Sequence, residues 1–279
     1  MKTKIVTQLA WCSCLLFLAS GCGSQKYEER LQSTVKYYEY LDVQNKNLAP
    51  AWALPNNAIS YRAPKQFEAI PAPISKDYNE EGELRPGKTD LRQPTNYIPG
   101  MIFSGLQAAW SVQIPIKQQK NSTNEKQTSI PGYLYLLSNR DYFMDDDLAE
   151  TASEFTDKTV ADLASMLSAS LPEEGAWSEI KVPEKPVYSK QKILLMASMK
   201  AEKDVLKQGV PTGIRVYRYD TEDIQTLLVF ILPLAIEEGK KDDGNKLLER
   251  IEMSLETFIA SDKIPKPNLP GGGDPTGGF

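Results

Sequence analysis

The sequence predicts an α+β domain in which a mainly antiparallel sheet is covered by two or three helices. Two observations predict this class. Segments with strand character follow one another with only turns between them, which favours antiparallel pairing. Two later segments repeat apolar residues at helical spacing along a single face, and such a face is stable only when it is buried against another element.

A long hairpin is expected in the first half of the sheet. Residues 109–116 alternate between apolar and polar side chains, residues 117–129 form a polar turn, and residues 133–137 return as the second strand. A short strand between prolines, at residues 58–62, precedes this hairpin.

The later strands include the centre of the sheet. Strands are expected at residues 177–182, 193–201 and 213–219. Residues 224–232 are nearly all apolar in their second half, which is typical of a strand covered on both faces. This last strand is therefore predicted to be central.

Three helices are expected. Residues 26–41 have helical periodicity with acidic and basic residues interleaved, and we expect this helix to pack on the domain; its tyrosines lying among lipid headgroups is the alternative. Residues 147–171 form the clearest helix, with Asp147 and Glu150 placed as a capping box. Residues 245–260 form the last helix.

The first residues have the layout of an export signal. Residues 1–4 are short and basic, residues 5–17 are mostly apolar but too short to cross a bilayer stably, and residues 18–22 read Leu-Ala-Ser-Gly-Cys. This last stretch resembles the lipobox of bacterial lipoproteins. The resemblance implies cleavage between Gly21 and Cys22 and acylation of the Cys22 thiol.

The lipoprotein resemblance also implies an anchor and a location. Cys22 would carry a thioether-linked diacylglycerol and an N-acyl chain, which together hold a protein stably on a membrane. Gly23 follows the cysteine where an aspartate would favour retention at the inner membrane. We therefore expect a lipid-anchored protein of the cell envelope, with the outer membrane, on its periplasmic or surface side, preferred over the inner membrane.

These features divide the chain into four parts. The signal peptide covers residues 1–21 and the lipidated tether residues 22–25. A single α+β domain covers residues 26–262, and a Pro/Gly-rich tail, expected to be disordered, covers residues 263–279.

Composition excludes several classes of function. The chain has no histidine, which removes Ser-His-Asp and Cys-His catalysis and His-ligated zinc. Its three cysteines are Cys12, Cys14 and Cys22, so the mature domain has no disulfide. The net charge of −5 makes nucleic acid a poor partner. No cofactor motif, metal site or catalytic residue is identified.

Three groups of residues have the chemistry to hold a ligand, although each also has a structural explanation. An acidic cluster could bind calcium but also suits a helix start; it comprises Asp141, Asp145, Asp146, Asp147 and Glu150. An Arg/Tyr strand could face an anion but also reads as an amphipathic strand; it comprises Arg215, Tyr217, Arg218 and Tyr219. Three tryptophans could line a sugar groove but also suit a core; they are Trp52, Trp110 and Trp177.

The order of elements resembles the PsbP-like and DcrB-like α/β/α sandwich group. The resemblance is carried by residues 59–64, an early strand that ends in proline, and by residues 228–233 and 251–258, a last strand and closing helix in which Ser254 and Phe258 recur. It implies an accessory or binding role and transfers no site residue.

The sequence therefore favours a membrane-anchored envelope lipoprotein with a non-catalytic domain that binds a partner protein or assists an assembly. Two alternatives remain open. A carboxylate-based hydrolase of envelope polysaccharide needs two acids about 5–10 Å apart in a cleft flanked by aromatics. A carrier of a small apolar ligand needs a cavity of a few hundred Å³ lined by aliphatic side chains.

Overall fold

The computed structural model describes residues 24–79, 83–118, 126–170, 177–202, 204–206, 211–237 and 246–265. The chain divides into two units, the first ending at Asn47 and the second beginning at Leu48. The predicted cleavage and acylation site at Gly21 and Cys22 lies outside the described residues, as does most of the expected tail. Across the described part of the chain, no helix combines the length and the apolar character needed to cross a membrane.

The first unit is described as one helix, α2 (Ser24–Asn47). It confirms the helix expected at residues 26–41 and extends it at both ends. Side-chain hydrogen bonds run back along the helix, from Ser33 Oγ to the Glu29 carbonyl and from Thr34 Oγ1 to the Arg30 carbonyl, both at 2.8 Å. That this helix packs on the domain stays a prediction.

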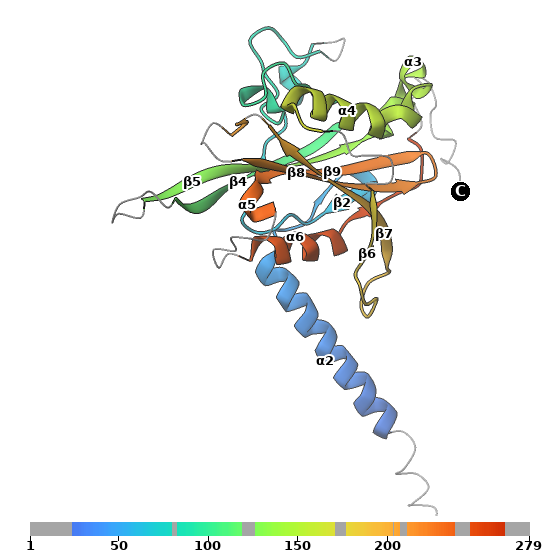
Figure 1. The fold of residues 1–279 in the computed structure, drawn as a ribbon. Coiled ribbons are helices and arrows are strands. Elements are labelled where there is room, and N and C mark those ends of the chain that lie inside the picture. Colours follow the sequence, from blue (N-terminus) through green and yellow to red (C-terminus); the bar gives the residue numbers. More distant parts are fainter. Residues whose placement is uncertain are drawn as a thin grey trace, which may run out of the picture. The chain divides into compact units, whose positions relative to one another are not determined.

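The second unit is built on a seven-stranded sheet in which every pairing is antiparallel (Figure 1). This confirms the predicted fold class. The strand order is β3-β4-β5-β9-β8-β7-β6. The strands are β3 (Glu68–Ile70), β4 (Leu106–Gln118), β5 (Lys126–Ser138), β6 (Ser178–Val182), β7 (Lys192–Ala201), β8 (Thr212–Thr221) and β9 (Ile224–Pro233).

Strand β9 is the centre of this sheet, as its apolar run predicted. It pairs with β5 on one side and with β8 on the other. Leu228 and Phe230 face one hydrophobic cluster, whereas Val229 and Ile231 face a second cluster on the opposite side. A strand that is buried on both faces needs apolar residues at successive positions, and β9 has them.

Helices cover both faces of the sheet (Figure 1). Helix α4 (Phe155–Leu167) packs with one cluster through Leu163 and Leu167. Helix α6 (Leu247–Glu256) packs with the other through Ile251 and Leu255. The architecture is thus a sheet between helical layers, as a sandwich requires; membership of the PsbP-like and DcrB-like group stays an expectation.

A small second sheet lies on the α6 side of the domain. Its order is β1-β2-β10, with β1 (Trp52–Ala53), β2 (Ile59–Tyr61) and β10 (Ile259–Ala260). Tyr61 Oη lies 2.7 Å from Ser254 Oγ, and the Tyr61 ring contacts Phe258 edge to face at 6.4 Å. Residues that carried the family resemblance, almost 200 positions apart in the chain, therefore meet in one core.

The helix expected at residues 147–171 is divided, which corrects the prediction. Asp145, not Asp147, caps a short helix by accepting a hydrogen bond from the Asp147 amide at 3.0 Å. Thr151 Oγ1 then donates to the Leu148 carbonyl, a local bond that competes with helix continuation. The remaining helical segments are α3 (Asp146–Ala149), α5 (Leu234–Glu237) and the 3₁₀ turns η1 (Pro55–Asn57), η2 (Ser75–Asp77), η3 (Pro94–Asn96), η4 (Asn139–Met144) and η5 (Ala152–Glu154).

Candidate binding groove

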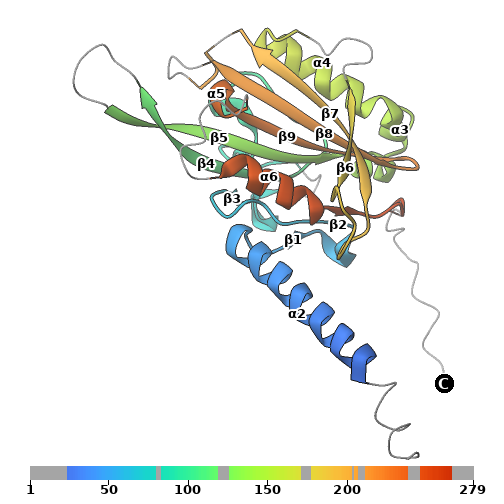
Figure 2. The ribbon, with the colours of Figure 1, turned by 60° about the horizontal axis from the view of Figure 1, so that its bottom comes forward.

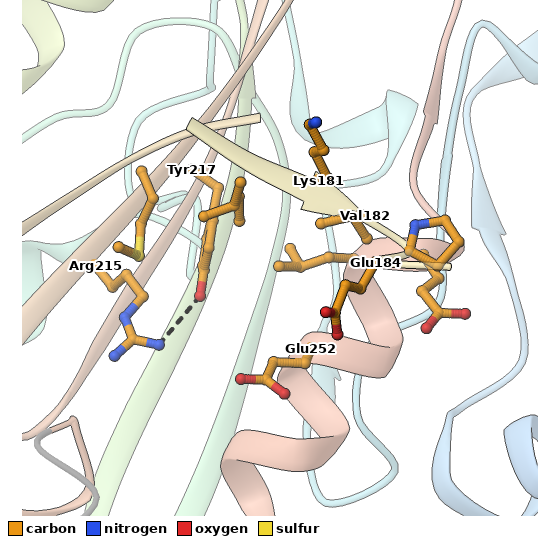
Figure 3. Close-up of a pocket in the computed structure, with 11 residues that line it drawn as sticks. Lys181, Val182, Glu184, Arg215, Tyr217 and Glu252 are labelled. Atoms are coloured by element: carbon orange, nitrogen blue, oxygen red, sulfur yellow. Dashed lines mark hydrogen bonds between the residues drawn. The ribbon is translucent and has the colours of Figure 1, made fainter. Parts of the chain in front are cut away.

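A groove of about 630 Å³ lies on the α6 side of the sheet, between β6, β7, β8 and the C-terminal half of α6 (Figure 3). Figure 2 shows β6 beside one end of α6. Partly buried or buried apolar side chains contribute to its lining; they are Ile180, Val182, Met196 and Leu255. Charged side chains also line it; they are Lys181, Glu184, Arg215, Glu252 and Glu256.

Strand β8 forms one wall of the groove. Its alternation places Ile214 and Val216 in the cluster under α4, so that Arg215 and Tyr217 face α6. Arg215 Nη1 donates to Tyr217 Oη at 3.2 Å. The Tyr217 ring is only 2% exposed and packs edge to face on Phe230, so its hydroxyl is held in place beside the guanidinium.

Helix α6 forms the opposite wall. Glu252 and Glu256 are four residues apart and therefore share one face of the helix. Glu252 is exposed, and Figure 3 shows it on the helix across from Arg215 and Tyr217. Leu255, on the side of the helix that faces the core, is buried. The amphipathic pattern of α6 thus places carboxylates on the groove and leucine beneath them.

The third wall consists of β6 and the residues that follow it. Lys181 and Glu184 are exposed, whereas Val182 and Pro183 between them are buried. The Val182–Pro183 peptide bond is cis. Three carboxylates and two cationic groups therefore line one groove, with apolar side chains between them.

A lysine ties the end of α6 to the sheet. Lys192, at the start of β7, donates to the carbonyl oxygens of Glu256 at 2.8 Å and Leu255 at 3.3 Å, and to that of Phe258. Cationic groups are favourable at a helix C-terminus because the last carbonyl groups have no partner within the helix. Burial lowers the pKa of Lys192 to about 8, although the neighbouring Glu256 carboxylate opposes this shift.

The lowered pKa of Lys192 predicts a pH dependence of stability. Because the unfolded lysine titrates near 10.4, the unfolded state binds more protons than the folded state between about pH 8 and that value, so this residue makes stability rise with pH there. Relative to a Lys192→Met variant, we expect the wild-type free energy of unfolding to increase by on the order of 1–2 kcal/mol over this range, measured by urea denaturation.

The comparison with Lys192→Met also removes the influence of the buried tyrosines. The pKa values of Tyr61 and Tyr135 are raised by burial, so both tyrosines lower stability as pH rises above about 10 in both proteins. A wild-type stability that falls relative to the variant between pH 8 and 10 would show that the three carbonyl oxygens outweigh desolvation.

The structure brings together only part of the predicted Arg/Tyr strand. Arg215 and Tyr217 line the groove, as their alternation implied. Tyr219 instead packs against Phe258 at 5.6 Å, and Arg218 forms an ion pair with Asp220 at 2.7 Å.

The other candidate groups have structural roles. Trp52 and Trp110 contact each other at 6.0 Å within one core, whereas Trp177 packs against the opposite cluster, so the three tryptophans form no common surface. Within the described ranges, no cluster of three or more possible metal ligands exists, and Asp145 serves as a helix cap.

The acidic residues of the groove could not be recognised from the sequence. Glu252 and Glu256 sit on the polar face of a helix that was predicted, but that spacing is also typical of a solvated face. Lys181 and Glu184 lie at one end of a predicted strand. Only the pairing of β6 with β7 and β8, and the position of α6 across them, brings these residues to the same place.

Comparisons with known proteins do not assign the chain to a family. No protein-family model matches it, and no curated protein matches it. Among solved structures, it is similar to the Ran-binding protein Mog1p of Saccharomyces cerevisiae, with a TM-score of 0.32 and 10% identity over 77% of this chain and 95% of that chain. A point mutant of Mog1 gives a TM-score of 0.33 and 11% identity over 77% and 96% of the two chains. Similarities with such low TM-scores and identities carry no argument about the function of this chain.

Proposed function

We propose that the protein is a lipid-anchored protein of the bacterial cell envelope whose domain binds a segment of a partner protein in the groove between α6 and the sheet. The proposal of an anchor is supported by the lipobox-like sequence that ends at Cys22, with the outer membrane as the proposed destination. The proposal of a binding domain is carried by the groove.

The groove has the composition of a protein-binding surface. Protein interfaces combine an apolar centre with a polar rim, and the groove has apolar side chains such as Met196 and Leu255 next to exposed Lys181, Glu184 and Glu252. Carboxylates on α6 and cations on the sheet allow a partner segment to be oriented by charge as well as by shape.

The same geometry favours binding over the two alternatives. Tyr217 is the sole aromatic residue among the described lining residues, and its ring is buried, so it offers no face on which a sugar can stack. Glu252 and Glu256 share one helix face rather than flanking a bond from two sides. Five charged residues in the lining are also unsuited to a purely apolar ligand.

Site-specific photocrosslinking in cells tests this function. A photoreactive phenylalanine analogue placed at Glu252 should give a discrete adduct with another protein, because this exposed position lines the groove. The matched position is Asp162, which is also exposed but lies on α4 across the sheet. Adding Glu256→Lys should reduce the adduct at position 252 at least about tenfold, since reversing one charge in contact with a partner costs on the order of 1.4 kcal/mol or more.

Two results would contradict the binding proposal. One is the absence of an adduct from position 252, and the other is equal adducts from positions 252 and 162. A carbohydrate adduct at position 252 would instead support the hydrolase.

A further inference from the structure

We propose that helix α2 is a spacer that holds the domain away from the membrane by up to the length of the helix; this rests on the anchor proposed at Cys22. The helix has 24 residues. At a rise of 1.5 Å per residue, it is about 36 Å long, which exceeds the thickness of the headgroup region of a bilayer.

The side chains of α2 are those of a helix surrounded by water. Four basic and four acidic residues are distributed around the circumference; they are Lys26, Glu28, Glu29, Arg30, Lys36, Glu39, Asp42 and Lys46. A helix that is polar on all sides is typical of a bridge through solvent, where spaced opposite charges support it.

Few residues of the sequence separate α2 from the proposed anchor or from the domain. A single residue, Gly23, separates Cys22 from the first helical residue. At the other end, Leu48 follows directly after the helix and is buried in the domain, where the Ala49 amide donates to the Ala63 carbonyl at 2.8 Å. In the proposed spacer, the helix therefore supplies nearly all of the residues between anchor and domain.

The alternative is a helix that lies flat on the lipid along its exposed apolar stripe. That stripe consists of Tyr27, Leu31, Val35 and Tyr38. Helices that lie on membranes combine a strong apolar face with an excess of Lys and Arg on the polar face. Here the basic and acidic residues balance, and Asp42 follows Leu41 where the stripe would continue. Charge and composition thus favour the spacer.

To test the spacer, the mature chain is coupled covalently to a lipid of a supported bilayer. Cys22 is the single cysteine of the chain that starts there, so its thiol couples specifically to a maleimide-bearing lipid. This makes the test independent of biological acylation, which is measured separately. Neutron reflectometry then gives the distance between the bilayer surface and the domain.

Two length variants make the outcome decisive. Deleting residues 30–36, or inserting seven alanine-rich residues after Glu39, changes α2 by about two turns and about 10 Å while nearly preserving its rotational phase. We expect the domain to move on the order of 10 Å toward the bilayer in the first variant and away from it in the second. Circular dichroism confirms that both remain helical.

A third variant separates the two orientations directly. Leu31→Gln combined with Val35→Gln removes the centre of the apolar stripe and should leave the distance unchanged. A distance that does not change with helix length would overturn the spacer, because α2 would then lie on the lipid or pack on the domain. A distance that increases when the stripe is removed would show that α2 lies on the lipid.

Discussion

Replacing Gly105 by alanine should lower the free energy of unfolding by about 3 kcal/mol or more. Gly105 has a φ of +67°, in the left-handed region where a Cβ atom costs on the order of 1–2 kcal/mol. A Cβ at this position would also lie 2.2 Å from the Ser138 carbonyl oxygen and 2.9 Å from the Phe155 ring. Since both the backbone carbonyl and the helix that carries Phe155 are fixed by packing, the strain must be relieved by moving β5 or α4.

Gly87 provides the matched control for this prediction. Its φ of +80° is equally left-handed, but no atom lies within 4 Å of the place that a Cβ would occupy. Gly87→Ala should therefore cost only the backbone strain, about 1 kcal/mol. Urea denaturation followed by tryptophan fluorescence measures both changes. Equal losses in the two variants would mean that the contacts around Gly105 relax without cost.

Changing Cys22 to serine should abolish fatty-acid attachment completely. A serine hydroxyl lacks the nucleophilic thiolate that accepts the diacylglycerol, so acylation and the cleavage before residue 22 should both be lost. Growth with labelled palmitate shows the attachment, and mass spectrometry of the purified protein shows the first residue. The expected change is all or none, because the sulfur atom carries the diacylglycerol and the amino group that would carry the N-acyl chain is freed only by the lost cleavage.

Cys14→Ser is the control for the acylation experiment, since this cysteine lies upstream in the predicted signal peptide. It should leave labelling and the mature amino terminus unchanged. Undiminished palmitate labelling of the Cys22→Ser protein would refute the anchor, and with it the proposed place in the envelope.

The strands of the sheet could be predicted from sequence because each is marked by a local pattern of apolar residues. The alternation in residues 109–116 predicted a strand and the apolar run in residues 224–232 predicted a strand buried on both faces, and β4 and β9 confirm these predictions. The amphipathic pattern of residues 245–260 likewise located α6, whose polar face and apolar face are set by the same spacing. The predicted end was wrong, because the helix stops at Glu256 and Ile259–Ala260 form β10.

The groove could not be predicted because its residues meet only through tertiary packing. Arg215 was recognised as part of a strand face, but its relation to Glu252 depends on where α6 crosses the sheet. The break near Thr151 was missed because the apolar pattern continues through it. There the Thr151 hydroxyl and amide both donate to the Leu148 carbonyl, a local arrangement that competes with helix continuation.

The strand order also determines when the domain can fold during synthesis. β5 must wait for β9, and β2 must wait for β10, which is among the last described residues to leave the ribosome. Contacts between such distant segments form slowly because a long loop must close first. A nascent chain therefore lacks the central strand of its sheet until residues 224–233 have been made. Such a delay keeps the chain unfolded for longer. An unfolded chain can pass through a translocation channel, as the proposed destination requires.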